Sequence, residues 1–126
     1  SGQVNPMGKK NQQSEIKRLL SACVYSAQGF KVCYTSEAAF RLEIWLGVVL
    51  LPLGYWLGEG ALEKVLLITP IFIVLIVEML NSAVEATVDR IGIEKHELSG
   101  FAKDVASAAV TLSLILFLVT WSIILL

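Results

Sequence analysis

The stretch VLLITPIFIVLIVEMLNSAVEATV, from Val65 to Val88, decides the fold. Its first thirteen residues carry no charge. A helix needs about 20 apolar residues to cross the hydrocarbon core of a bilayer, so this stretch is predicted to be a membrane-spanning helix. Its second half is different, because carboxylates appear at positions where lipid should lie.

Five polar side chains of this region share one helical face. Glu78, Asn81, Ser82, Glu85 and Asp89 stand at steps 0, +3, +4, +7 and +11, which at 3.6 residues per turn form one row, here named the acidic stripe. Acidic residues at membrane depth are costly, and they usually mark a functional site that faces a bundle interior or an aqueous cavity. Two alternatives stay open: Glu85 and Asp89 belong to a solvated helix end, or Glu78 is a protonated structural donor.

Two further apolar stretches are predicted to span the membrane. One covers about residues 42–58, and the other covers residues 105–126 without a single charge. Pro52 and Pro70 lie inside the first and second spans, where a membrane helix can accept a proline and kink.

A predicted amphipathic helix over about residues 14–34 precedes the spans. Its apolar residues recur at steps of three and four, at Ile16, Leu19, Leu20, Cys23, Ala27 and Phe30. Such a helix lies in the headgroup layer with its apolar face down, and packing on protein is the alternative. Ser36 is expected to be the N-cap of the helix that runs into the first span.

Composition is consistent with an all-α membrane protein of one domain. The 126 residues are 56% hydrophobic and 17% charged, and the mean hydropathy is +0.71. A net charge of −1 does not indicate a nucleic-acid-binding protein. Ser1 to Pro6 lacks the order of a signal peptide and is interpreted as a cloning remnant ahead of a domain over residues 7–126. Cys23 and Cys33 are expected to be free thiols.

Basic residues near the span ends predict the orientation. They precede the first span at Lys9, Lys10, Lys17, Arg18, Lys31 and Arg41, and they follow the second at Arg90, Lys95 and Lys103. Only Lys64 lies in the turn between the first two spans. The positive-inside rule therefore predicts a cytoplasmic N-terminus and a cytoplasmic loop over residues 89–104, with the turn over residues 58–64 and Leu126 outside.

The remaining chemistry points to phosphate and magnesium. The sequence has no GxxxxGK[ST] loop, no zinc spacing and no serine nucleophile elbow, and its one histidine, His96, is expected to be a surface side chain. Carboxylates and an asparagine are hard oxygen ligands that suit magnesium, which one or two carboxylates commonly hold together with nucleotide phosphates. In phosphoryl transfer, a protein mainly positions the reactants and neutralises charge.

Three stretches resemble the prokaryotic integral-membrane diacylglycerol kinase family. They are EAAFRLE (Glu37 to Glu43), VEMLNSAVEATVDRIG (Val77 to Gly92) and HELSGFAKDVASAAV (His96 to Val110). The likeness runs from about Arg18 to Trp121, and its central ExxNxAxExxxD pattern is highly specific. The DRIG and HELSG segments are similar to the Gram-negative branch rather than to the related undecaprenol kinases of Gram-positive bacteria.

The resemblance implies a homotrimer of three-span chains in the bacterial cell inner membrane, with sites shared between neighbouring chains. It implies transfer of the γ-phosphoryl of MgATP to the primary hydroxyl of diacylglycerol, which gives phosphatidic acid. By matching position, Glu78 would be the general base and Asn81 would orient the phosphate or the base. Glu37 and Glu85 would hold Mg²⁺ beside ATP.

Further roles follow from matching positions. The resemblance implies ATP contacts from Arg18, Tyr25, Ser26, Lys103 and Asp104, and lipid contacts from Glu43 and Ser107. Three residues depart from the family pattern: Ala27 where a large aromatic is frequent, Leu42 in place of a polar residue, and Phe101 in place of a basic one.

The residues alone leave simpler explanations open. Glu37 could form a helical i,i+4 pair with Arg41, and Lys103 with Asp104 could be a charge pair in a loop beside the third span. A small non-catalytic scaffold, or an ion pathway lined by the acidic stripe, is the rival function from another class. Undecaprenol kinase activity is the alternative within the same family.

Overall fold

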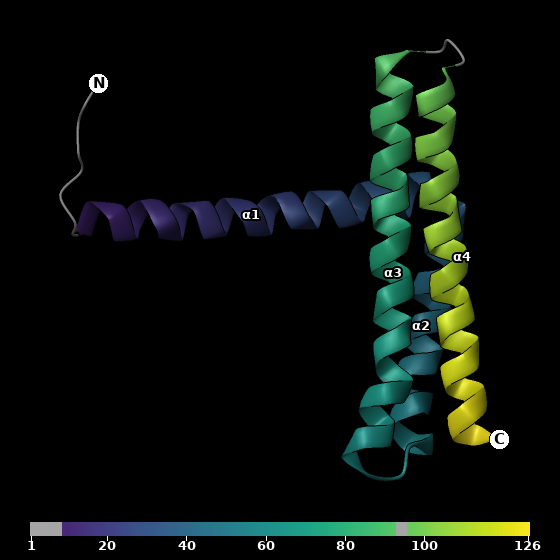
Figure 1. Cartoon of the computed structure of the whole chain (residues 1–126). Coiled ribbons are helices and arrows are strands. Elements are labelled where there is room, and N and C mark those ends of the chain that lie inside the picture. Colours follow the sequence, from purple (N-terminus) through teal and green to yellow (C-terminus); the bar gives the residue numbers. More distant parts are fainter. Residues whose placement is uncertain (1–8, 93–95) are drawn as a thin grey trace. The chain divides into compact units, whose positions relative to one another are not determined.

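The computed structural model describes residues 9–92 and 96–126. Its helices follow in the order α1 (Lys9–Ser36), α2 (Ala38–Leu57), α3 (Gly60–Ile91) and α4 (Glu97–Leu125) (Figure 1). In this part of the chain, α2, α3 and α4 are each long and apolar enough to cross a membrane. The predicted all-α class, three membrane-length helices after an N-terminal helix, is confirmed. The expected cloning remnant, Ser1 to Pro6, and Lys95 lie outside the described residues.

The chain divides into two compact units, residues 1–36 and residues 37–126. In its described part, the first unit is α1, a continuous helix of 28 residues. The prediction that Ser36 caps the next helix is wrong. The Ser36 hydroxyl donates back to the Val32 carbonyl in the last turn of α1, and the extended residue Glu37 (φ −114°, ψ 107°) is the N-cap of α2 without a side-chain cap bond.

The second unit is a three-helix bundle in which α3 packs against both α2 and α4. Its small core contains Phe40, Leu67, Ile71 and Val74. Most other large apolar side chains of the three helices are exposed. Because soluble monomers rarely expose apolar patches of more than a few hundred Å², this surface needs lipid or further protein against it.

The connection between α2 and α3 is shorter than the predicted turn over residues 58–64. Only Gly58 and Glu59 lie between the helices. The Glu63 side chain accepts a hydrogen bond from the Glu59 backbone N–H at 3.1 Å, which satisfies a donor at the start of α3. A Cβ on Gly58 would come within 2.8 Å of the Lys64 backbone nitrogen, so only glycine fits this turn.

The connection between α3 and α4 is also shorter than the predicted loop over residues 89–104. Residue Ile91 ends α3 and Glu97 begins α4. His96 is the N-cap of α4, and its Nδ1 accepts from the Leu98 backbone N–H at 3.0 Å. Lys103 and Asp104 therefore lie on the first turns of a helix and not in a loop, because the helix begins well before its charge-free part.

The three helices pack closely near the C-terminus of α4. The Trp121 indole N–H donates to the Leu67 carbonyl at 2.9 Å, and the Trp121 ring lies 5.1 Å from the Phe117 ring. A Cβ on Gly54 would meet Leu67 at 3.3 Å and Trp121 at 3.4 Å, so glycine permits this close approach. These four residues are named the Trp121 cluster.

Candidate active site

The acidic stripe changes its environment along α3. Glu78 is buried, with 7% of its surface exposed. It does not lie at the end of the helix, because α3 continues to Ile91. Asn81, Ser82 and Glu85 are half-buried, and Asp89 is exposed. The solvated-end explanation therefore describes Asp89 but not Glu78. A carboxyl group this deep in an apolar helix requires a partner or a function.

The partner of Glu78 is Glu43, which α2 supplies. The two carboxyl groups lie close enough to interact electrostatically. Glu37, at the start of α2, and Glu85, on the next turns of α3, are close enough to act on Glu78 electrostatically. The Glu43 oxygen Oε2 is buried and has no hydrogen-bond partner among the described residues.

Asn81 and Glu85 form a second pair one turn further along α3. The Asn81 Nδ2 donates to Glu85 Oε1 at 3.3 Å, a long hydrogen bond. The Asn81 Oδ1 is buried and has no hydrogen-bond partner in the part of the chain that the structure describes. Most buried polar side-chain atoms in proteins are hydrogen-bonded, so the unpartnered oxygens of Glu43 and Asn81 indicate a site that is completed by something other than this one chain.

A third pair joins α4 to α3. The Lys103 Nζ lies 2.6 Å from Asp89 Oδ1, and both side chains are substantially exposed. Sequence reasoning placed Asp89 on the acidic stripe but did not identify Lys103 as its partner. The pairing arises because the two helices pack side by side around a short connection.

The remaining predicted site residues come from the start of α2, from α4 and from α1. Glu37 is half-buried at the N-cap of α2, and Asp104 and Ser107 are exposed on α4. Arg18, Tyr25 and Ser26 are exposed residues of α1, in the first unit. The second unit thus brings together the pairs Glu43 with Glu78, Asn81 with Glu85, and Asp89 with Lys103.

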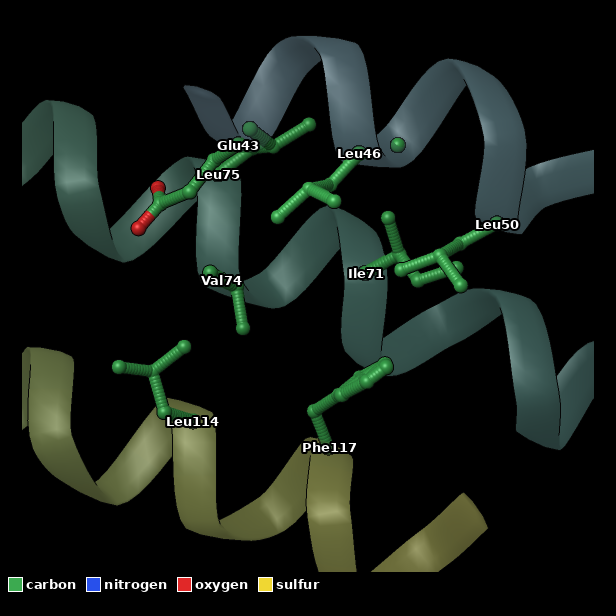
Figure 2. Close-up of a pocket in the computed structure, with 9 residues that line it drawn as sticks. Glu43, Leu46, Leu50, Ile71, Val74, Leu75, Leu114 and Phe117 are labelled. Atoms are coloured by element: carbon green, nitrogen blue, oxygen red, sulfur yellow. The ribbon is translucent and has the colours of Figure 1, made fainter. Parts of the chain in front are cut away.

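Sequence reasoning missed an apolar pocket beside Glu43. The pocket has a volume of about 90 Å³, and Figure 2 shows that residues of α2, α3 and α4 surround it. Gly47 lines it, and this single small residue inside a run of bulky ones was the available signal.

A magnesium site can be tested against the donors that are present. No group of three or more His, Cys, Asp or Glu side chains that could hold a metal ion occurs in the described residues. Glu85 presents carboxylate oxygens next to the unpartnered Asn81 Oδ1, and Glu37 adds a carboxylate nearby. These hard oxygen donors fit magnesium when nucleotide phosphates supply the remaining ligands.

Comparisons with known proteins agree with this chemistry. Residues 24–125 match the family described as prokaryotic diacylglycerol kinase. The chain is 47% identical over 114 residues to a diacylglycerol kinase of Pseudomonas aeruginosa, an alignment that covers 90% of this chain and 93% of the relative. It is 45% identical over 115 residues to that of Escherichia coli (91% and 94% covered) and 46% identical over 106 residues to that of Haemophilus influenzae (84% and 90%).

Proposed function

The chain belongs to the prokaryotic diacylglycerol kinase family, and on this basis we propose that it phosphorylates diacylglycerol with ATP. The product is phosphatidic acid. A new bond forms between the lipid hydroxyl oxygen and the γ-phosphorus, the bond from that phosphorus to the bridging oxygen breaks, and ADP leaves. The observation that carries the proposal is Glu78, a buried carboxyl group in a membrane-length helix that also holds the polar pairs beside it.

Glu78 accepts the proton of the lipid hydroxyl during this transfer. A diacylglycerol hydroxyl lies near the headgroup boundary, so its base must lie deeper than the groups that hold the nucleotide. Glu78 is two turns deeper along α3 than Glu85. The Glu43 carboxyl group of α2 lies close enough to act on it electrostatically. The transfer is direct and in line, without a covalent enzyme intermediate, and Glu43 and Ser107 contact the lipid.

Glu85 and Glu37 hold Mg²⁺, and Asn81 orients the phosphate or the base. Bound magnesium neutralises charge on the phosphates of ATP. Lys103 and Asp104 contact the nucleotide, as do Arg18, Tyr25 and Ser26 of α1. The contact between Lys103 and Asp89 supports this role, because it shows that the Lys103 cation reaches the acidic stripe of α3.

The active protein is a homotrimer in the bacterial cell inner membrane, with each site shared between neighbouring chains. Two observations support this assembly. The bundle exposes a large apolar surface, and the described residues of one chain leave buried polar atoms without partners.

The N-terminus is cytoplasmic and Leu126 is periplasmic. We expect a membrane-impermeant thiol reagent to label a cysteine at Gly60 in intact cells, and a cysteine at Leu98 only after permeabilisation, with Cys23 and Cys33 both replaced by alanine. Both test positions flank exposed helix starts. The reverse labelling pattern would contradict the orientation.

The test of the function is formation of phosphatidic acid by the purified full chain in lipid vesicles. We expect radiolabelled phosphate to pass from ATP to added diacylglycerol only when magnesium is present. Undecaprenol in place of diacylglycerol tests the alternative substrate, and ion flux across the same vesicles without ATP tests the pathway alternative. Phosphorylation of undecaprenol but not of diacylglycerol, or ion flux without kinase activity, would refute the proposal.

A further inference from the structure

A histidine caps the start of α4. His96 has the extended backbone of an N-cap residue (φ −119°, ψ 139°), and its carbonyl accepts the first backbone hydrogen bond of the helix, from the Gly100 N–H at 3.0 Å. Its Nδ1 accepts from the Leu98 N–H, also at 3.0 Å. The roles proposed above do not use this side chain, although it begins the helix that carries Lys103 and Asp104.

The N-caps of the two other membrane-length helices differ from His96. Glu37 of α2 and Glu59 of α3 make no side-chain cap bond. The residues that usually cap helices are serine, threonine, aspartate and asparagine, which accept hydrogen bonds at neutral and at mildly acidic pH. Histidine side chains change their charge between pH 5 and 8. The start of α4 therefore has a cap that responds to pH in this range.

Only the neutral imidazole can form this cap. One nitrogen of the neutral ring accepts a hydrogen bond, whereas the imidazolium ion carries a proton on both nitrogens and can only donate. A protonated Nδ1 would place its own N–H against the N–H of Leu98. The positive charge would also lie at the positive end of the helix dipole. Protonation thus removes a hydrogen bond and adds a repulsion.

The first turn of α4 has little packing to replace the cap. Residues 96–98 and Gly100 are exposed, and Ser99 is half-buried. Helices in proteins are stabilised mainly by packing of an apolar face, so an exposed turn depends more strongly on its cap. Loss of a good N-cap typically shifts the equilibrium of helix formation by about twofold to thirtyfold.

The α4 turns after the cap carry the ion pair to α3. Lys103, whose partner is Asp89, lies seven residues after His96, about 10 Å along the helix axis. Figure 1 shows that α3 ends at the same end of the bundle at which α4 begins. The charged groups of these helix ends are Asp89 and Arg90 on α3 and Glu97, Lys103 and Asp104 on α4, and Glu94 and Lys95 of the connection lie outside the described residues. Among the described groups, none forms an ion pair with the exposed His96 ring.

We propose that His96 is a positioning residue for nucleotide binding: its neutral ring holds the first turn of α4 so that Lys103 reaches the nucleotide, and its protonation releases that turn. The inference rests on the proposed ATP contacts of Lys103 and Asp104. In the switch, a proton from solvent binds Nδ1, and the hydrogen bond from the Leu98 N–H breaks. The affinity for MgATP therefore falls as His96 is protonated below neutral pH.

The binding test compares the wild type with two variants of the full chain in lipid vesicles. His96→Asn keeps a cap that does not titrate, and His96→Ala has none. Titration with magnesium and a non-hydrolysable ATP analogue gives the dissociation constant from pH 5.5 to pH 8. We expect the wild type to match His96→Asn at pH 8 and to approach His96→Ala at pH 5.5, with a dissociation constant about threefold to tenfold above that of His96→Asn.

Comparing the proteins at each pH cancels the titration of the nucleotide and of the other charged groups. His96→Ser, a second cap that does not titrate, takes the place of His96→Asn if that variant does not fold. Phosphatidic acid formation by the wild type is measured separately. Its absence would refute the proposed function, whereas analogue binding decides the role of His96 because it requires no turnover.

Amide hydrogen exchange over residues 98–101 reports on the cap itself. We expect these amides to exchange faster in the wild type than in His96→Asn at pH 5.5, and equally at pH 8. Equal exchange at both pH values would show that the cap does not respond to protonation. A pH-dependent exchange with unchanged nucleotide affinity would confine the effect to the first turn. Tighter binding by the wild type at pH 5.5 would mean that the imidazolium contacts the phosphates directly. Each of these three results would overturn the inference.

Discussion

Buried polar groups are satisfied to different degrees at the two ends of the bundle formed by α2, α3 and α4. In the Trp121 cluster, the indole N–H donates to the Leu67 carbonyl, the Trp121 ring lies beside the Phe117 ring, and Gly54 leaves room for Leu67 and Trp121. At and beside the acidic stripe, Asn81 Oδ1 and Glu43 Oε2 are buried without hydrogen-bond partners among residues 9–92 and 96–126, and the Asn81 bond to Glu85 is long. The indole N–H of the Trp121 cluster has its hydrogen-bond partner within the described residues, whereas the polar atoms at the acidic stripe do not all have one.

This difference separates stability from function. Unpartnered buried polar groups cost free energy, and proteins keep such groups mainly where activity needs them. The Trp121 cluster should therefore contribute to the free energy of unfolding and little to turnover. The acidic stripe should contribute to turnover and little to stability. Each prediction below tests one side of this division.

The largest effect is expected for Glu78→Gln. Glutamine has nearly the same shape but cannot accept the hydroxyl proton, and general-base help is worth about 10² to 10⁴ in rate. Turnover of diacylglycerol should fall by at least about a hundredfold, while the dissociation constant of MgATP changes little. Glu59→Gln, on the exposed connection between α2 and α3, is the matched control and should keep normal turnover. Near-normal phosphorylation by Glu78→Gln would show that the carboxyl group is structural.

A smaller and reversible loss is expected for Glu85→Gln and Glu37→Gln. Each substitution removes one charged oxygen ligand. Loss of an outer-shell partner of a ligand alone typically costs about 10-fold to 100-fold in metal affinity or activity, so we expect a loss of at least about tenfold. Raising the magnesium concentration should restore part of the activity, as measured by initial rates across a magnesium titration. A loss that magnesium does not change, accompanied by a lower unfolding temperature, would make these residues structural.

The Trp121 cluster should show the reverse behaviour. Trp121→Phe keeps an aromatic ring near Phe117 but removes the hydrogen bond to Leu67. We expect the free energy of unfolding to fall by about 1 kcal/mol, the typical net value of one hydrogen bond, and turnover per folded molecule to stay unchanged. Denaturation in mixed micelles measures the first quantity and initial rates measure the second. Unchanged stability with lost turnover would place part of the active site at this end.

The smallest effect is expected for Asp89→Asn. The Asp89–Lys103 pair is exposed, and such pairs contribute about 0 to 1 kcal/mol. If Lys103 contacts the nucleotide, releasing it from Asp89 should lower KM for MgATP by at most about fivefold at low salt. The effect should disappear at high salt because exposed charges are screened. A higher KM would show that Asp89 positions Lys103 rather than competing for it.

Sequence periodicity predicted the three membrane-length helices and the common face of the acidic stripe. It misplaced their ends, because an apolar run marks what lies in lipid and not where a helix is capped. His96 caps the start of α4, and the Glu59–Glu63 hydrogen bond lies at the start of α3; both starts lie outside the apolar runs. The Ser36 hydroxyl bonds within α1 and does not cap α2.

The contacts between helices could not be predicted from one sequence. The approach of Glu43 to Glu78, the Asp89–Lys103 pair and the pocket at Gly47 all depend on how far one helix is displaced along the next. Periodicity within a helix carries no information about that register. The roles of the matched residues, from Arg18 on α1 to Ser107 on α4, remain predictions.

The central claim is that the Glu43–Glu78 pair serves catalysis and not folding, and the unfolding temperature of the double variant Glu43→Leu/Glu78→Leu tests it most directly. Replacing both members of a buried polar pair by apolar residues of similar volume is often neutral or stabilising, whereas removing one member leaves the other unpaired. We therefore expect the double variant to unfold at the wild-type temperature or above it, with no detectable phosphorylation of diacylglycerol. A clearly lower unfolding temperature would show that the carboxyl pair holds α2 on α3, and would contradict the account.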